Sequence, residues 1–169
     1  MLSDLFIPKN NVISYYNARF LIKFTIFAEN RQKMFKERII ELNKIKDKRG
    51  NLSVIEDNTL LPFTMARTYW VYDVPGGESR GGHAYYKSEE FIIALSGSFD
   101  LYIHDGKEER KYRLELCNRG VYVPAGIWRR LQNFATNSIA LVISSAPYSH
   151  KDYIRDFDRF IQLKKENAI

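Results

Sequence analysis

The distribution of apolar and polar residues predicts a series of short β-strands along most of the chain. At positions 99–104, Phe, Leu and Ile alternate with Asp, Tyr and His, which is the period of a half-buried strand. Asp105-Gly106 follows as a hairpin signal. Similar patterns predict strands within residues 66–72, 90–95, 112–116, 121–124 and 139–144, and another that starts with Leu52, Val54 and Ile55. Strands at this short spacing indicate a β-sandwich or barrel.

Only the tail of the chain shows a helical period. Between residues 151 and 165, apolar side chains recur at helical spacing at Tyr153, Ile154, Phe157, Phe160 and Ile161. We therefore expect an all-β domain with a C-terminal helix. A double sheet of the jelly-roll kind would protect the sheet edges and enclose a ligand cavity.

The first 33 residues show no clear period, so we divide the chain into an N-terminal extension of unknown role (1–33) and one domain (34–169). The run from Phe20 to Phe27 is apolar, but Lys23 interrupts it, and a membrane-spanning helix needs about 20 apolar residues. The run suits a buried strand or a surface that docks on a partner chain. Two hypotheses explain the extension: translation starts at Met34, or the segment adds a strand or a dimer contact.

Length and charge narrow the class of ligand. A chain of 169 residues suits one domain with a proper core, and a net charge of +6 suits an anionic partner. The basic residues are scattered and no basic recognition helix is apparent, so a phosphorylated small molecule fits better than a nucleic acid, beside the plainer interpretation of a solvated surface. The single cysteine, Cys117, agrees with a cytoplasmic location and is expected to be a small buried hydrophobe. We expect no membrane span.

Two stretches carry the candidate chemistry, and together they resemble the two halves of the cupin signature. They are residues 80–90 (RGGHAYYKSEE), closed by Gly97, and residues 120–129 (GVYVPAGIWR), ending at Asn133. Metal cupins supply two histidines one residue apart, a carboxylate and, after a Pro-x-Gly turn, a third histidine. Here the corresponding residues are His83, Tyr85, Glu89 or Glu90, and Arg129. One histidine and one carboxylate beside a fixed guanidinium make a poor metal site, so we expect no metal and no other cofactor.

Strand geometry adds two expectations. His83 and Tyr85 are two residues apart, so they point to the same face of a strand. Glu89 and Glu90 are adjacent, so they face opposite sides and cannot form a carboxylate pair on one bond. His104, beside a hairpin turn, and His150, before the final helix, are expected to face solvent.

From about Ile40 to Leu163, the chain resembles the bacterial dTDP-4-keto-6-deoxyglucose 3,4-ketoisomerases, the FdtA/QdtA-like or WxcM-like C-terminal cupins. The matching pieces are DKRGNL (47–52), PF (62–63), RTYW (67–70), RGGHA (80–84), SGS (96–98), Trp128 and DYIR (152–155). The joint occurrence of RGGHA and DYIR is the specific part. The resemblance implies a cupin barrel, a homodimer with exchanged strands, and a product used for amino sugars of surface glycans. Family members usually have His at position 85, often Gln at position 90, and either His or Arg at position 129.

The implied reaction moves a ketone from C4 to C3 of a dTDP-linked keto-sugar. A base removes the C3 proton, an enediol forms, and a proton returns at C4. His83 is the expected base, because histidine titrates near working pH, and Tyr85 is the expected proton relay or donor to the enediolate. The expected substrate-binding residues are Arg49 and Arg129 for sugar or enediolate oxygens, Arg80 for the diphosphate, and Glu90, Tyr69, Trp70 and Trp128.

Structural roles are the alternatives at several positions, namely barrel packing for Tyr85 and Trp128 and surface salt bridges for Arg80 and Arg129. Two other functions also fit the sequence. One is a nucleotide-sugar binder without turnover, and the other is a dTDP-sugar 3,5-epimerase with a histidine base and a tyrosine acid. A ligand-sensing regulator and a metal-dependent oxygenase fit less well.

Overall fold

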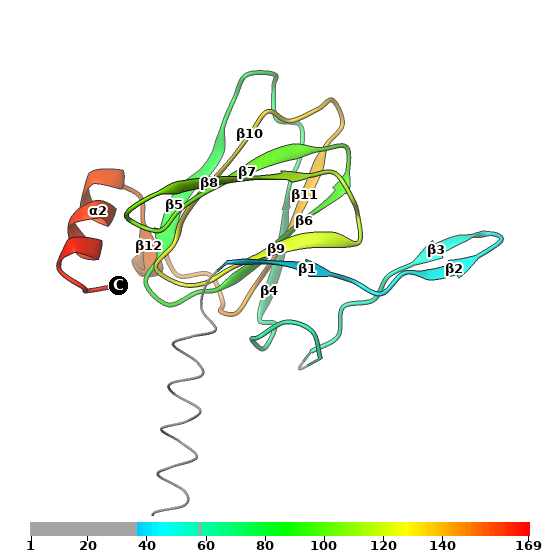
Figure 1. Ribbon diagram of the computed structural model, residues 1–169, viewed down its shortest axis with the longest axis horizontal. Coiled ribbons are helices and arrows are strands. Elements are labelled where there is room, and N and C mark those ends of the chain that lie inside the picture. The colour runs from blue at the N-terminus through cyan, green and yellow to red at the C-terminus, as the bar shows by residue number, and fades with distance from the viewer. Residues whose placement is uncertain (1–36, 58) are drawn as a thin grey trace, which may run out of the picture. The chain divides into compact units, whose positions relative to one another are not determined.

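The computed structural model describes residues 37–57 and 59–169, and residues 37–169 form one compact unit. Two antiparallel five-stranded sheets face each other, and a helix lies beside one end (Figure 1). This arrangement confirms the all-β class and the C-terminal helix. The proposed extension at residues 1–33, with its apolar run, lies outside the described residues.

Each sheet brings together strands that are distant in the sequence. The first sheet contains, in spatial order, β1 (Arg38–Glu41), β9 (Arg119–Val123), β6 (Glu90–Ser96), β11 (Ile139–Ser144) and β4 (Arg67–Val71). The second contains β12 (Tyr153–Ile154), β5 (Arg80–Tyr85), β10 (Trp128–Gln132), β7 (Phe99–His104) and β8 (Glu109–Leu114). Most neighbouring strands are not consecutive in the chain, so positions such as 83, 90 and 129 meet only through the fold.

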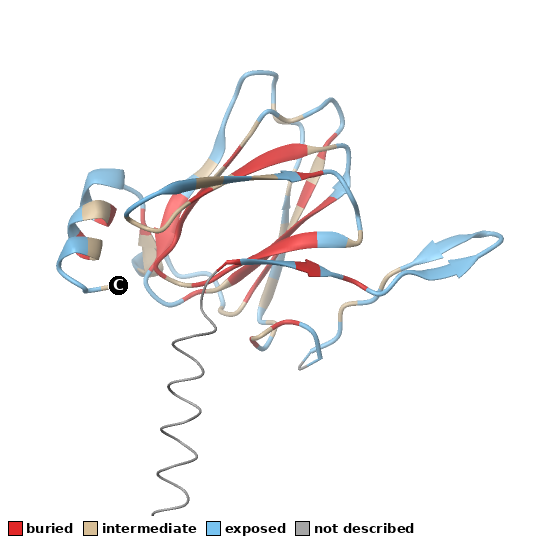
Figure 2. Ribbon diagram, in the orientation of Figure 1, coloured by how far each residue is buried: buried red, intermediate tan, exposed pale blue. Residues whose placement is uncertain are grey.

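The hydrophobic core lies between the two sheets (Figure 2). Alternate residues of the strands face inward, including Ile92 and Ala94 of β6 and Phe99, Leu101 and Ile103 of β7, and all five are essentially inaccessible to solvent. A smaller apolar cluster lies on the outer face of the second sheet, where the helix α2 (Phe157–Lys165) packs through Phe160 and Leu163. The barrel therefore has an apolar core between the sheets and one covered outer face.

The helix is shorter than the sequence pattern predicts. It begins at Phe157, where the side chain of Asp156 caps it by accepting a hydrogen bond from the Arg159 backbone N–H. The preceding residues form the 3₁₀ turn η1 (His150–Asp152) and the strand β12, which pairs Tyr153 with Tyr85 and Ile154 with Ala84. Ile154 packs in the same cluster as Phe160, so the apolar spacing that resembled one helix arises from two elements.

A hairpin of β2 (Ile45–Asp47) and β3 (Gly50–Leu52) projects from the barrel, and all six of its strand residues are exposed (Figure 1). The predicted strand that continues through Val54 and Ile55 is wrong, because β3 ends at Leu52. Ile45, Leu52 and Val54 expose apolar side chains on or beside this hairpin.

Two local predictions are also wrong. Cys117 is exposed rather than buried, because β8 ends at Leu114 and Cys117 lies in the turn before β9. His104 is partly buried rather than solvent-facing: its ring packs edge-on against Phe157 at 5.2 Å between centroids, and its Nδ1 accepts a hydrogen bond from the Gly106 N–H. His150 is exposed, as expected.

Candidate active site

Polar residues gather on the inner faces of both sheets at one end of the barrel. In the first sheet, Arg67 of β4 pairs with Ser144 of β11, which pairs with Glu90 of β6. Directly paired residues share a face, and the next inward row along the same strands is Tyr69, Val142 and Ile92. Arg67, Ser144 and Glu90 therefore form a polar row at the end of an otherwise apolar interior.

Arg129 of β10 faces this row from the opposite sheet and forms a buried ion pair with Glu90. Its Nε and Nη2 donate to Glu90 Oε2 at 2.9 and 2.7 Å, and the two side chains are 3% and 1% exposed. Nη2 also donates to the Tyr69 hydroxyl and Nη1 to the Gly81 carbonyl oxygen. Burial alone would lower the pKa of Arg129, but the negative charge of Glu90 raises it above its ordinary value.

The second oxygen of Glu90 accepts two phenol hydrogen bonds. The hydroxyl of Tyr69 donates to Glu90 Oε1 at 2.6 Å and that of Tyr85 at 3.0 Å. Burial, with the nearby charge of Glu90, raises the pKa of both phenols, so both stay protonated. The proton of Tyr85 is therefore directed to Glu90. Glu89 is engaged elsewhere, by the hydroxyl of Tyr122, which confirms that the two glutamates do not form one pair.

His83 lies beside this network on β5, opposite Arg129. Its ring contacts Tyr85 at 4.7 Å and Tyr153 of β12 at 4.8 Å between centroids, which confirms that His83 and Tyr85 share a face. The side chain is buried, and Nε2 has no hydrogen-bond partner within the described part of the chain. Burial and the positive charges of Arg129, Arg155 and Arg67 lower the pKa of His83 to about 2, so it is a neutral acceptor rather than a group that titrates near pH 7.

Gly81 holds Arg129 in place through a close approach of its backbone. It has φ +68°, and a Cβ there would clash with Arg129 Nη1. Substitution Gly81→Ala is expected to lower the free energy of unfolding by about 2–4 kcal/mol, from left-handed backbone strain plus overpacking. Urea unfolding measures this loss. Gly76→Ala is the matched control, because its Cβ would meet nothing within 4 Å, and equal losses for both variants would contradict the role assigned to Gly81.

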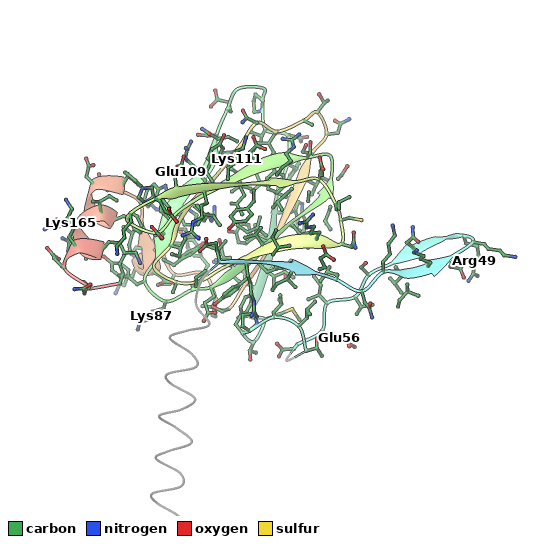
Figure 3. The ribbon with its side chains drawn as sticks, viewed as in Figure 1. Arg49, Glu56, Lys87, Glu109, Lys111 and Lys165 are labelled. Atoms are coloured by element: carbon green, nitrogen blue, oxygen red, sulfur yellow. The ribbon has the colours of Figure 1, made fainter. Side chains whose placement is uncertain are left out.

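The structure leaves several residues of the predicted site outside this cluster. Arg49 lies on the projecting hairpin, with a side chain that is 91% exposed and paired with Asp47 (Figure 3). Arg80 is exposed at the start of β5, and Trp70 is 59% exposed on β4. Trp128 packs against Phe157 and Phe160 under the helix. Trp128 and Arg129 are adjacent in β10, so only one of them can face the interior, and Arg129 does.

The fold adds residues that the sequence analysis left without a role. Tyr153 completes a ring triangle with His83 and Tyr85, and Arg67 lies over the rings of Tyr69 and Tyr148, at 5.2 and 5.6 Å from their centroids. Tyr148 in turn contacts Tyr153 at 5.7 Å. Arg67 and Tyr153 belong to the RTYW and DYIR motifs that carry the family resemblance, so the sequence could have pointed to them. No motif in the sequence marks Ser144 as a site residue.

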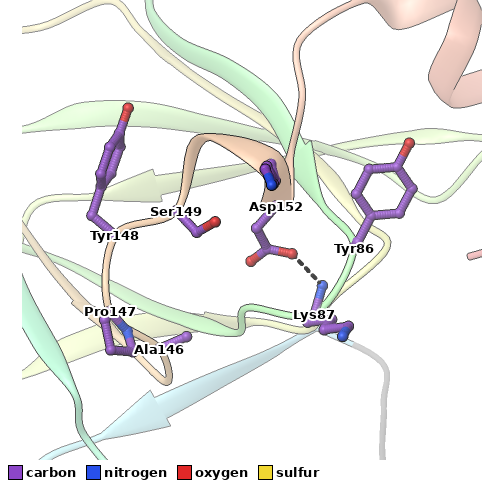
Figure 4. Close-up of a pocket in the computed structure, with 8 residues that line it drawn as sticks. Tyr86, Lys87, Ala146, Pro147, Tyr148, Ser149 and Asp152 are labelled. Atoms are coloured by element: carbon purple, nitrogen blue, oxygen red, sulfur yellow. Dashed lines mark hydrogen bonds between the residues drawn. The ribbon is translucent and has the colours of Figure 1, made fainter.

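A groove of about 520 Å³ borders the aromatic cluster at Tyr148 (Figure 4). Its lining residues are Tyr86, Lys87, Ala146, Pro147, Tyr148, Ser149, Lys151 and Asp152. The Asp152 carboxylate accepts hydrogen bonds from the backbone N–H groups of Lys87 and Ser88 and from the Ser88 hydroxyl. These bonds fix the segment before β12 against the turn after β5, and so hold Tyr153 beside His83.

The donor set does not favour a metal ion. Within residues 37–57 and 59–169, no three His, Cys, Asp or Glu side chains are grouped closely enough to hold one. Glu90 already balances the charge of Arg129, and His83 is the only histidine beside it.

Within residues 37–57 and 59–169, the helices are too short or too polar to cross a membrane.

Two facing antiparallel sheets with a polar cluster between their inner faces define a cupin-type barrel. The family model FdtA, described as "WxcM-like, C-terminal", matches residues 35–165, and the chain belongs to this family. The TDP-4-oxo-6-deoxy-alpha-D-glucose-3,4-oxoisomerase of Aneurinibacillus thermoaerophilus is 35% identical over 135 residues, which cover 76% of this chain and 97% of that protein.

Solved structures agree with this assignment. A 3,4-ketoisomerase from Helicobacter canadensis is 30% identical, with a TM-score of 0.75 over 78% of this chain and 98% of its own. A mutant of the 3,4-ketoisomerase QdtA from Thermoanaerobacterium thermosaccharolyticum, in complex with TDP-4-keto-6-deoxyglucose, is 29% identical, with a TM-score of 0.76 over 79% and 96%. The dTDP-4-dehydrorhamnose 3,5-epimerase of Bacillus anthracis is 18% identical over 70% of this chain and 77% of its own, with a TM-score of 0.63, and shares the fold.

Proposed function

We propose that this protein is a sugar-nucleotide 3,4-ketoisomerase that converts a dTDP-4-keto-6-deoxyhexose to its 3-keto isomer. The observation that carries the proposal is the buried, neutral His83, whose Nε2 has no hydrogen-bond partner among the described residues and lies among charged and phenolic groups. The family and the activity of the 35% identical oxoisomerase support it.

In this proposal, Nε2 of His83 removes the proton from C3 of the sugar, and the electrons of the broken C–H bond form the enediolate with the C4 carbonyl. The C4 oxygen then takes up a proton and the C3 hydroxyl releases its own, so that the carbonyl forms at C3 while a proton returns to C4. The geometry supports His83 as the base because Nε2 has no partner within residues 37–57 and 59–169, whereas Tyr69 and Tyr85 already direct their protons to Glu90. For Tyr85 to deliver a proton, its bond to Glu90 must break, so we assign it first to holding His83 and Glu90.

Arg129, Glu90 and Tyr69 have a supporting role in this scheme. Their mutual bonds, together with the bond from Arg129 to the Gly81 carbonyl, join β4, β5, β6 and β10 behind the imidazole. A buried and fully bonded network of this kind fixes the position of a reacting group and lowers the cost of reorganisation during the reaction.

The low pKa of His83 leads to a prediction for stability against pH. A histidine whose folded pKa lies below its unfolded value near 6.5 stabilises the fold above pH 6.5, and this contribution is lost as the pH falls, because only the unfolded chain binds the proton. Between pH 7 and pH 5, His83 is expected to remove about 2 kcal/mol from the free energy of unfolding. Urea titrations of wild type and His83→Asn at both pH values isolate this term, and parallel pH curves for the two proteins would contradict it.

The test of function is an NMR time course in D₂O with purified protein and dTDP-4-keto-6-deoxyglucose. A 3-keto product carrying deuterium at C4 is the expected result, and the configuration at C4 would show which face is protonated. Saturable binding of the sugar nucleotide without exchange or product would instead support the non-catalytic binder. Exchange at C3 and C5 with retention of the 4-ketone would support the 3,5-epimerase, for which the likeness shows the fold alone.

We also propose a cytoplasmic homodimer in which the β2–β3 hairpin reaches a second copy. The exposed Ile45, Leu52 and Val54 support an interface, and Arg49 at the hairpin turn would then enter the partner's site. Light scattering tests the dimer. Mixing inactive Arg49→Gln and His83→Asn chains tests the sharing of sites, because a mixed dimer would regain one complete site and therefore activity. If Arg49 acts within its own chain or not at all, mixing restores nothing.

A further inference from the structure

Arg67 has an unusual environment for a cation at the end of a barrel interior. Its guanidinium lies on the rings of Tyr69 and Tyr148, and its Nε is buried with no hydrogen-bond partner in the part of the chain that the structure describes. Within residues 37–57 and 59–169, no carboxylate forms an ion pair with it. Arg67 as a whole is only partly buried and its other contacts are with tyrosine side chains, so an anionic ligand would supply the counter-charge that the described residues do not.

Among the described residues, the other arginines that face the barrel interior already have carboxylate partners. Arg129 is bonded to Glu90, Tyr69 and the Gly81 carbonyl, and Arg110 pairs with Glu37 and Asp105. Glu90 and Arg67 lie in the same inward row, but the negative charge of Glu90 is already balanced by Arg129. Glu90 therefore does not compensate the positive charge of Arg67. Arg129 is therefore poorly placed to receive an anion, and among the described arginines that face the barrel interior, Arg67 is the one without a carboxylate partner.

Two more unpartnered polar atoms belong to the same end of the interior. Ser144 pairs directly with Arg67 across β4 and β11, is fully buried, and has a hydroxyl without a partner among the described residues. His83 Nε2, from the opposite sheet, is the other. A guanidinium, a hydroxyl and an imidazole nitrogen supply two kinds of donor and one acceptor, which is a set that suits an oxygen-rich, negatively charged ligand.

We propose that Arg67 receives an oxyanion of the substrate, with the Ser144 hydroxyl as a second donor. The inference rests on the proposed function for the identity of the ligand. Two groups of a dTDP-keto-sugar have this chemistry: the enediolate that forms beside His83, and the diphosphate. In the first case Arg67 stabilises charge that develops during the reaction, and in the second it anchors the ground state.

The test compares Arg67→Gln and Arg67→Lys with the control Arg130→Gln. Arg130 also lies over a ring, that of Tyr102 at 4.3 Å, but it is on the outer face and pairs with Glu109. Calorimetry measures TDP affinity, and steady-state kinetics separate kcat from KM. If the oxyanion is the enediolate, Arg67→Gln lowers kcat about 10²–10³-fold and leaves TDP affinity unchanged. If it is the diphosphate, TDP affinity falls about 10- to 100-fold, and Arg67→Lys recovers part of it.

Thermal unfolding without ligand separates a binding role from a structural one. A binding role predicts that Arg67→Gln melts close to the wild-type temperature, because Arg67 is partly exposed and has no ion pair with a described residue to lose, and that TDP raises its melting temperature less. Wild-type kcat and TDP affinity for Arg67→Gln, with Arg130→Gln also unchanged, would overturn the inference. If the wild type binds TDP but has no isomerase activity, the proposed function fails. The TDP affinity and the melting temperature of Arg67→Gln then still decide whether Arg67 receives the diphosphate. If TDP binds Arg67→Gln as tightly as wild type and raises its melting temperature equally, the inference is overturned.

Discussion

Substitution His83→Asn is expected to lower kcat about 10²–10⁴-fold, which is the usual contribution of a general base, while the protein stays folded. Asparagine occupies a similar place on β5 but cannot take a proton from carbon at neutral pH. The loss is expected in kcat and not in the affinity for TDP, because Nε2 would act on the sugar carbon rather than on the nucleotide. Stopped assays by NMR, together with calorimetry of TDP binding, measure the two effects separately.

The control for this prediction is His150→Asn. His150 is exposed in η1 and lies outside the cluster around Glu90, so its replacement is expected to leave kcat within about twofold, as for most surface changes. Activity of His83→Asn within tenfold of wild type would show that another group removes the C3 proton. Tyr153, whose ring contacts that of His83, would then be the next residue to replace.

Removal of the Glu90 carboxylate is expected to have the largest effect on stability. Glu90→Ala leaves the guanidinium of Arg129 buried without its counter-charge and deprives Tyr69 and Tyr85 of their acceptor. Loss of one partner of a buried ion pair costs about 3–5 kcal/mol. Urea unfolding at pH 7 is the measurement, and a fall in activity is expected as well, since the bonds behind His83 are lost.

The matched control is Glu109→Ala, which breaks the partly exposed pair between Glu109 and Arg130 at 2.9 Å. Exposed pairs contribute about 0–1 kcal/mol, so the loss should be several times smaller. The double variant Glu90→Ala, Arg129→Leu should regain much of the stability lost in Glu90→Ala, because no buried charge then remains unpaired. A loss of less than 1 kcal/mol for Glu90→Ala would mean that water reaches Arg129 in solution.

Much of the site could be predicted from local sequence. The period of two in β5 places His83 and Tyr85 on one face, and the same rule separates Glu89 from Glu90. The family could be identified because the RGGHA and DYIR pieces occur together, and the family match and the structural neighbours agree with it. The same rule also separates Trp128 from its neighbour Arg129, so the assignment of both to one site was wrong.

The strand-forming pattern, the class of fold and the motif that contains His83 can therefore be predicted locally, since they depend on residue type and local period. Which side chains meet depends on the fold. The pairing of β4, β11 and β6 places Arg67, Ser144 and Glu90 in one row, although they are 23 to 77 positions apart. The fold also decided that β12 precedes the helix and brings Tyr153 to His83. Such contacts depend on register between strands that are distant in the chain, and a one-residue shift would turn each of these side chains to the other face.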